Sequence, residues 1–177
     1  MKNLKVGKKF LLVFGSIIVC TTLALIITIS GLVNTANRYT YFYTKNYLVV
    51  SRIGDMGMDL QGGAKSLALS TMESVDTGIE RAVSDATSQY TAYEESRTWI
   101  NENYEGDKTL LNDVGNKIAS VESVMQQIIA LSRENTAEGK QEAQSLLVNS
   151  FNPVVLEAVS SLRSFTDQVK AQVDANY

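Results

Sequence analysis

An apolar stretch near the N-terminus constrains this chain more than any other feature of its sequence. The stretch runs from Phe10 to Val33, contains 24 residues and carries no charged side chain. At about 1.5 Å per residue, a helix of this length crosses the roughly 30 Å hydrocarbon layer of a bilayer with some tilt. A cleaved secretory signal is the competing interpretation, but its apolar region has only about 7 to 15 residues and is followed by a small-residue cleavage site. The sequence therefore favours a membrane anchor.

The charges before the stretch predict its orientation. No acidic residue precedes it, and four lysines do: Lys2, Lys5, Lys8 and Lys9. Basic residues on the short side of a membrane helix keep that side in the cytoplasm. We therefore expect a protein of the cell membrane, with residues 1–9 as a cytoplasmic N-terminus, residues 10–33 as a transmembrane helix in contact with the lipid bilayer, and residues 34–177 as an extracytoplasmic domain.

The composition of the predicted external domain argues against several functional classes. Twelve of the sixteen Lys and Arg and all nineteen Asp and Glu lie there, and the resulting net charge of −7 disfavours a nucleic-acid partner. The chain has no histidine, and its single cysteine, Cys20, lies within the apolar stretch. A Cys/His zinc site and a Cys or Ser–His nucleophile are therefore excluded. Because the carboxylates occur among opposite charges in a helical pattern, the sequence predicts no metal, no cofactor and no enzyme.

Apolar residues recur at alternating steps of three and four throughout residues 34–177, which contain a single proline. This spacing is typical of amphipathic helices that bury one face. It defines four rows: Phe42, Val49, Ile53, Met56, Leu60, Gly63 and Leu67; Ile79, Val83, Ala86, Tyr90, Tyr93, Arg97, Ile100 and Tyr104; Leu111, Val114, Ile118, Val121, Met125 and Ile128; Val148, Phe151, Val155, Ala158, Leu162, Phe165 and Val169. The short links between rows predict an all-α fold, in which the transmembrane helix continues into an antiparallel up-down-up-down four-helix bundle.

Helix-capping residues lie between the rows. Thr77 with Glu80 predicts a capping box at the start of the second helix. The pair Gly106–Asp107 predicts a stop followed by the N-cap of the third helix, and the pair Asn135–Thr136 predicts the same before the fourth.

Two local features allow alternative interpretations. Pro153 lies inside the fourth row, so either the helix kinks there or a first stretch, Ala137 to Asn149, ends and Pro153 lies in the first turn of a new one; we favour the second. Gly62 and Gly63 each cost about 1 kcal/mol in a helix interior. They predict close approach to a neighbouring helix or subunit, or else a local loosening of the first helix.

Two segments of the chain carry the pattern of a known family. One is the lysine-bearing start from Met1 to Leu12, followed by a membrane helix and a helical external domain. The other runs from Ala137 through Leu146 and Leu147 to Pro153. With these segments the chain resembles methyl-accepting chemotaxis proteins that have a four-helix-bundle sensor, a pattern shared with sensor kinases and other membrane receptors.

The resemblance implies the external sensor region of a chemoreceptor-type signal transducer. Such a region forms a homodimer, binds a small-molecule ligand or a solute-binding protein, and transmits a helix displacement across the membrane. A membrane-anchored helical scaffold or interaction protein without a ligand is one alternative, and the input module of a sensor kinase or other receptor is another. Amino-acid-binding family members group several arginines on the first external helix near its membrane-distal end, where this chain has only Lys65, so no ligand residue is carried over.

Arg97 is the full charge on an otherwise apolar row, and burying an unpaired guanidinium costs several kcal/mol. Helical rise places Asp113 and Arg52 at about the level of Arg97. An Arg97–Asp113 ion pair is therefore the first interpretation, and exposure of the long side chain to solvent is the second. Joint binding of an anionic ligand by Arg52 and Arg97 is the third. Trp99 is predicted on the solvent side of its helix, where a contact surface is one interpretation but not the favoured one.

Overall fold

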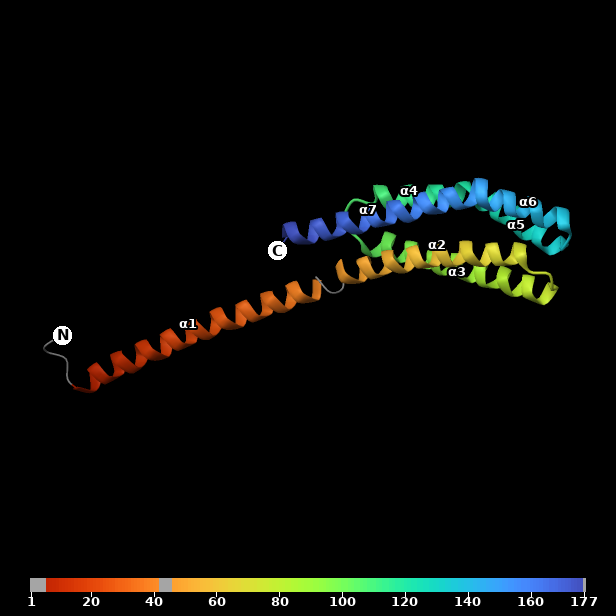
Figure 1. Cartoon of the computed structure of the whole chain (residues 1–177). Helices are drawn as coiled ribbons and strands as arrows, with labels where there is room; N and C mark the ends of the chain where they lie inside the picture. Colours follow the sequence, from red (N-terminus) through yellow and green to blue (C-terminus); the bar gives the residue numbers. More distant parts are fainter. Residues whose placement is uncertain (1–5, 42–45, 177) are drawn as a thin grey trace. The chain divides into compact units, whose positions relative to one another are not determined.

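The computed structural model describes residues 6–41 and 46–176, and in these ranges the fold is all-helical (Figure 1). It divides into two compact units, Met1–Tyr43 and Thr44–Tyr177. The main elements are α1 (Val6–Tyr41), α2 (Leu48–Met72), α3 (Asp76–Asn103), α4 (Thr109–Ser120), α5 (Glu122–Glu134), α6 (Ala137–Leu146), the π-helix η2 (Leu147–Phe151) and α7 (Asn152–Asn176).

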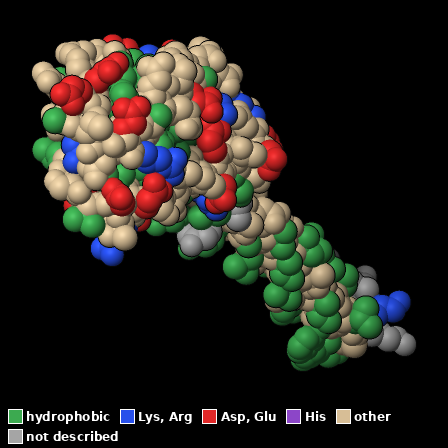
Figure 2. Space-filling view, turned by 90° about the vertical axis from the view of Figure 1, so that its right-hand side faces the viewer, with side chains coloured by type: hydrophobic (Ala, Val, Ile, Leu, Met, Phe, Trp, Pro, Cys, Tyr) green, Lys and Arg blue, Asp and Glu red, His purple; other side chains and the backbone are tan. Residues whose placement is uncertain are grey.

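Helix α1 contains the predicted membrane segment. By length and composition, Val6–Thr40 is apolar enough to cross a membrane. Its apolar side chains are exposed along the helix, whereas acidic and basic side chains gather on the other unit (Figure 2). The Thr21 hydroxyl donates to the Ile17 carbonyl at 2.9 Å, a bond that offsets the cost of a polar group in hydrocarbon. The predicted continuation into the next helix falls on residues 42–45, outside the described residues.

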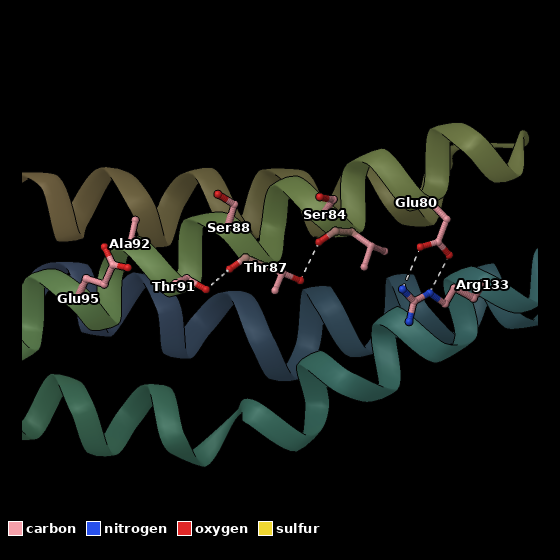
Figure 3. A pocket seen from close by; sticks show the side chains of 9 residues that line it. Glu80, Ser84, Thr87, Ser88, Thr91, Ala92, Glu95 and Arg133 are labelled. Carbon is pink, nitrogen blue, oxygen red and sulfur yellow. Dashed lines mark hydrogen bonds and ion pairs between the residues drawn. The ribbon is translucent and has the colours of Figure 1, made fainter.

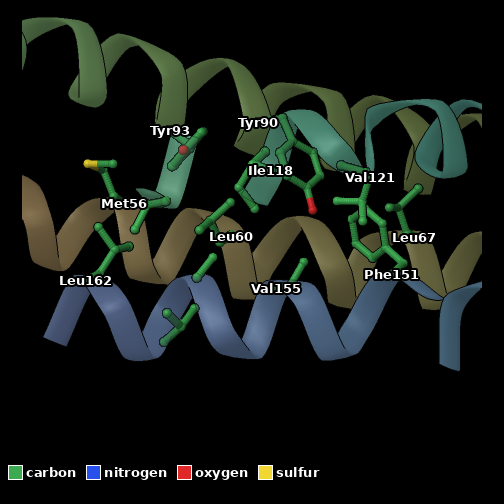
Figure 4. Packing of buried hydrophobic residues seen from close by; sticks show 14 of the residues in the cluster. Met56, Leu60, Leu67, Tyr90, Tyr93, Ile118, Val121, Phe151, Val155 and Leu162 are labelled. Carbon is green, nitrogen blue, oxygen red and sulfur yellow. The ribbon is translucent and has the colours of Figure 1, made fainter. Parts of the chain in front are cut away.

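The helices of the second unit pack around one apolar core. Helix α2 lies beside α3 and α7, α4 lies beside α7, and α5 lies beside α6 (Figure 1). One residue from each predicted row illustrates the core, which Figure 4 shows in part: Ile53, Val83, Ile118 and Leu162 are all buried. Because burying a large apolar side chain contributes about 1.5–3 kcal/mol, these rows are the main source of stability. The rows are confirmed as buried faces, apart from Met125 and Arg97, which are half-buried, and Val148; Phe42 lies outside the described residues.

The third row is divided between two helices. Helix α4 ends at Ser120, α5 begins at Glu122, and Val121 between them has φ −108° and ψ 4°. The Ser120 hydroxyl donates to the Lys117 carbonyl at 2.6 Å, while the Val121 N–H donates to Ile118 at 3.1 Å instead of to that carbonyl. A serine hydroxyl that competes for a helix carbonyl slightly destabilises and bends a helix, so the Ser120 bond favours a change of direction here. Val121 is nevertheless buried, so the row continues through the break.

The fourth row differs from its prediction near its start. Val148 is 61% exposed, and the buried residue is its neighbour Leu147. Buried positions from Gly139 to Val155 advance four residues at each step. Repeated steps of four drift around a helix of 3.6 residues per turn. The wider turn of the π-helix η2, residues Leu147–Phe151, absorbs this drift and keeps the row facing the core.

The interpretation that a first stretch ends at Asn149 and a new one begins near Pro153 is confirmed only in part. Pro153 lies in the first turn of α7, which begins at Asn152, but α6 ends at Leu146 and η2 follows it directly. The backbone continues through η2 into α7, and the Asn152 N–H donates to the Leu147 carbonyl, five residues back. Pro153 has no N–H, and in a regular α-helix its ring would clash with the carbonyl of Asn149. The wider π-turn just before the proline provides the space that its ring requires.

The predicted turn between α5 and α6 is confirmed. Asn135 ends α5 in the left-handed conformation, with φ 51°. Thr136 is the N-cap of α6, and its hydroxyl accepts a hydrogen bond from the Gly139 N–H at 3.0 Å. The carboxylate of Asp107 accepts from the N–H of Thr109 at 2.9 Å, close to the start of α4, although Lys108 is the residue at the N-cap position.

The predicted capping box of Thr77 and Glu80 is wrong. Helix α3 begins at Asp76, two residues earlier than a Thr77 N-cap predicts, and its N-cap residue Val75 makes no side-chain cap bond. Glu80 instead accepts two hydrogen bonds from Arg133 of α5, at 2.8 and 2.9 Å. A carboxylate that meets a guanidinium on a neighbouring helix is not available to the backbone of its own first turn.

These two helix starts give a matched test. Thr136→Ala is expected to lower the free energy of unfolding by about 1 kcal/mol, because it removes an N-cap hydrogen bond. Thr77→Ala is expected to change it by less than about 0.5 kcal/mol, because Thr77 is exposed and lies after the first residue of α3. Urea denaturation of both variants measures the difference, and equal losses would contradict the assigned caps.

Candidate functional site

Arg97 does not pair with Asp113, so the predicted ion pair is wrong. Its guanidinium donates to Glu94 Oε2 from Nε at 3.0 Å and from Nη2 at 2.6 Å. Asp113 instead accepts hydrogen bonds from Lys117 at 2.5 Å and from Ser161 at 3.0 Å, and these bonds lower the pKa of its carboxyl group. Arg97 and Asp113 thus each find a charged partner within one turn of their own helix.

Arg52 and Arg97 lie on different sides of α3. The Arg52 guanidinium lies over the ring of Trp99, 5.1 Å from its centroid. Positions 97 and 99 are separated by about 200° around a helix, so their side chains leave α3 in nearly opposite directions. Trp99 is half-buried against the core, and its prediction as a solvent-side residue is wrong. Arg97 lines the cavity described next, and Arg52 is not among its lining residues.

A cavity of about 380 Å³ opens where α3, α4 and α5 meet beside η2. We call it the Tyr90 cavity. Its volume is within the range of about 300 to 1,000 Å³ that is usual for small-molecule sites. The residues that define it are Tyr90 and Arg97 of α3, Ile118 of α4, Val121 at the break, Met125 of α5 and Phe151 of η2.

The buried walls of the Tyr90 cavity are apolar. Ile118, Val121 and Phe151 are buried, and the Phe151 ring meets Tyr90 edge to face at a centroid distance of 6.1 Å (Figure 4). The Tyr90 hydroxyl is buried and has no hydrogen-bond partner. Burial raises the pKa of Tyr90, so the hydroxyl keeps its proton. An unpaired buried group of this kind costs about 1–3 kcal/mol.

The mouth of the Tyr90 cavity carries the Arg97–Glu94 ion pair. The two side chains are 31% and 49% exposed. Gly115 of α4 leaves room for the guanidinium, because a Cβ added at this glycine would meet Arg97 Nη1. The ion pair therefore lies close against the α4 backbone. It narrows the opening without adding net charge.

A second hollow, of about 540 Å³, lies along the outward face of α3 (Figure 3). The hydroxyl groups of Thr87 and Thr91 donate to the carbonyls of Val83 and Thr87, and Glu80 is held by Arg133. Apart from Val83 and Ala92, the residues that line this hollow are exposed. The Tyr90 cavity has buried apolar walls and is therefore the stronger candidate site.

Sequence reasoning assigned Tyr90 and Phe151 to the core and did not find the cavity between them. The signal in the sequence is weak: Gly115 and Ala119 place two small residues four positions apart on an amphipathic helix. Small residues at this spacing leave volume unfilled only where the neighbouring helices do not close over them, and that depends on tertiary packing.

Within the described ranges, no three or more His, Cys, Asp or Glu side chains are arranged to hold a metal ion. Comparison of the chain with protein-family models, with curated proteins and with solved structures finds no match. The geometry of the Tyr90 cavity and the character of α1 are therefore the basis for a functional proposal.

Proposed function

We propose that the chain is the sensor region of a membrane-anchored signal transducer, in which α1 is the anchor and the external helical domain binds a small solute in the Tyr90 cavity. The observation that carries this proposal is the Tyr90 cavity, whose volume of about 380 Å³ suits a small solute. A purely structural bundle gains nothing from such a hollow, because unfilled volume loses packing contacts. A binding domain recovers these contacts when its ligand enters.

The proposal includes the finer architecture: an up-down-up-down four-helix bundle outside the membrane, with the N-terminus of α1 in the cytoplasm. The neighbours of α2 and α7 support the bundle, and the four lysines at the start of the chain support the orientation. The resemblance to methyl-accepting chemotaxis proteins supports a receptor of that type.

Phe151 links the Tyr90 cavity to α7. Its ring lines the cavity, and its backbone is the last residue of η2, directly before α7. A π-turn and an α-turn of the same segment differ in register by one residue, so a change in the position of this ring is coupled to the register of α7. Shifts of about 1–2 Å between packed helices are a known means of transmitting a signal.

A stability screen tests the proposal on the full chain in lipid nanodiscs, with unfolding followed by the fluorescence of Trp99, the only tryptophan. A ligand at 100 times its dissociation constant adds about 2.7 kcal/mol to the free energy of unfolding. We expect a library of small metabolites to contain a compound that stabilises the chain. Ala119 lines the cavity at an exposed position, and Ala119→Phe is expected to block its opening with a ring. Ala130→Phe, at an exposed position of α5 away from the cavity, is the matched control.

A compound that stabilises the wild type and Ala130→Phe but not Ala119→Phe supports a solute sensor that uses the Tyr90 cavity. Stabilisation that survives Ala119→Phe contradicts the assigned site. A library without any stabilising compound counts against the sensor and in favour of a scaffold.

A further inference from the structure

We infer that the ligand of the Tyr90 cavity is an amphipathic organic cation. Its apolar body lies against the walls of the cavity, and its protonated amine lies at the mouth beside the carboxylates of Glu94 and Glu122. The inference rests on the proposed function and names the chemical class of its ligand.

The apolar body follows from the walls of the cavity. Ile118, Val121 and Phe151 are buried and provide aliphatic and aromatic surface, and Met125 is half-buried beside them. Methionine adapts its shape to different ligands and makes favourable sulfur–aromatic contacts. A single ring matches these walls. Because the same four side chains carry no oxygen, they do not provide the ligands that a hard metal cation requires, and a cation bound here is an organic one.

The positive charge of the ligand follows from the net charge at the mouth. The charged residues that line the cavity are Glu94, Arg97 and Glu122, and two carboxylates with one guanidinium give a net charge of −1. Arg97 neutralises Glu94 at 2.6 Å, so the charge of Glu122 remains. Lys117 of α4 does not compensate it, because Lys117 is paired with Asp113 at 2.5 Å. A mouth of this sign attracts cations and repels anions.

Carboxylate oxygens at the mouth are available as hydrogen-bond acceptors. Both bonds from Arg97 end on Oε2 of Glu94, and from the described residues Oε1 accepts none. Glu122 is exposed in the first turn of α5, and it makes no ion pair or side-chain hydrogen bond with the described part of the chain. An ammonium group has three N–H donors for these oxygens. An anion would instead meet two like charges and a guanidinium that is already paired.

Three probes built on one ring separate the chemical classes: 2-phenylethylamine is a cation at pH 7, 2-phenylethanol is its neutral analogue and phenylacetate is an anion. The full chain in nanodiscs of zwitterionic lipid, labelled with ¹³C at its methionine methyl groups, is titrated with each probe. The Met125 methyl signal, assigned with Met125→Leu, reports binding in the cavity itself. Empty nanodiscs measure how much of each probe the lipid absorbs.

We expect 2-phenylethylamine to bind about three- to fivefold more tightly than 2-phenylethanol at low ionic strength, a ratio that corresponds to one partly exposed ion pair. Glu122→Gln is expected to bring the ratio close to one. Glu138→Gln is the matched control, because Glu138 is also exposed in the first turn of its helix, α6, but does not line the cavity. This variant is expected to keep the preference for the amine.

Arg97→Met distinguishes a cation from an anion by the sign of its effect. Removal of the guanidinium leaves two carboxylates at the mouth, so the preference for 2-phenylethylamine over 2-phenylethanol is expected to rise about twofold. If Arg97 held an anionic ligand instead, phenylacetate would bind the wild type more tightly than 2-phenylethanol, and the variant would lose this preference.

Equal binding of 2-phenylethylamine and 2-phenylethanol by the wild type would overturn the inference, as would a preference for the amine that persists in Glu122→Gln. Tighter binding of phenylacetate that disappears in Arg97→Met would show that the ligand is an anion. These results refute the organic cation while the proposed sensor stands. If no probe moves the Met125 signal, the inference fails, and the sensor is then decided by the metabolite screen with Ala119→Phe.

Discussion

Replacing Phe165 with alanine is expected to lower the free energy of unfolding of the helical domain by about 3–5 kcal/mol. The Phe165 ring is fully buried in α7 and packs edge to face on Tyr104, with the ring centroids 5.4 Å apart. The Tyr104 hydroxyl in turn donates to Gln172 at 2.6 Å. Removing the ring opens a hollow beneath this contact. Since domains of this size are stable by only about 5–15 kcal/mol, the loss is a large fraction of the total, and urea denaturation followed by circular dichroism measures it.

The control for this substitution lies in the same row. Val148 belongs to the predicted apolar row but is exposed, so Val148→Ala is expected to change the stability by less than about 0.5 kcal/mol. Leu147→Ala, one residue earlier and buried, is expected to cost about 2–5 kcal/mol. If Val148→Ala were the more damaging of these two neighbours, the π-turn register would be wrong.

The buried faces could be predicted from the sequence because burial depends on periodicity, and periodicity is a property of the chain itself. Ile53, Val83 and Leu162 recur at helical spacing within their rows, and all three are buried. The same logic failed at Val148, where the helix changes its own period. A row that advances by four residues is compatible with a drifting α-helix or with a π-turn, and only packing against the rest of the core decides between them.

The candidate site was harder to predict because it depends on contacts between side chains. Helical rise correctly gives the level of Arg97 along α3, but it does not choose between Asp113 on α4 and Glu94 one turn away. A partner on the same helix requires no particular register between helices, and Arg97 pairs with Glu94. The unpaired hydroxyl of Tyr90 is further beyond the reach of sequence reasoning, because it is defined by what its neighbours do not provide.

The adjacent glycines of α2 show how the helix interior supports the site. The helix runs unbroken through Gly62 and Gly63, so the predicted local loosening is absent and close approach to a neighbouring helix is what these residues provide. A Cβ at Gly63 would lie 2.8 Å from Cε2 of the Tyr90 ring, and one at Gly62 would lie 3.0 Å from Oε1 of Gln89. Gly63 therefore sets the position of the ring that carries the unpaired hydroxyl.

Gly63→Leu is expected to lower the free energy of unfolding by about 1–3 kcal/mol, because the Tyr90 ring is held by Phe151 and cannot move away freely. The displaced ring is expected to enter the Tyr90 cavity and to abolish the binding of any compound that the stability screen finds there; urea denaturation measures the loss of stability.

Gly54→Leu is the matched control on the same helix. A Cβ at Gly54 meets nothing within 4 Å, so the substitution is expected to raise the free energy of unfolding by up to about 1 kcal/mol through helix propensity alone. It is expected to leave ligand binding in the Tyr90 cavity unchanged. Because the two variants make the same chemical change at two positions of α2, opposite signs of the stability change isolate the contact with Tyr90. If Gly63→Leu were as stable as Gly54→Leu and still bound ligand in the Tyr90 cavity, the approach of α2 to α3 would not position Tyr90.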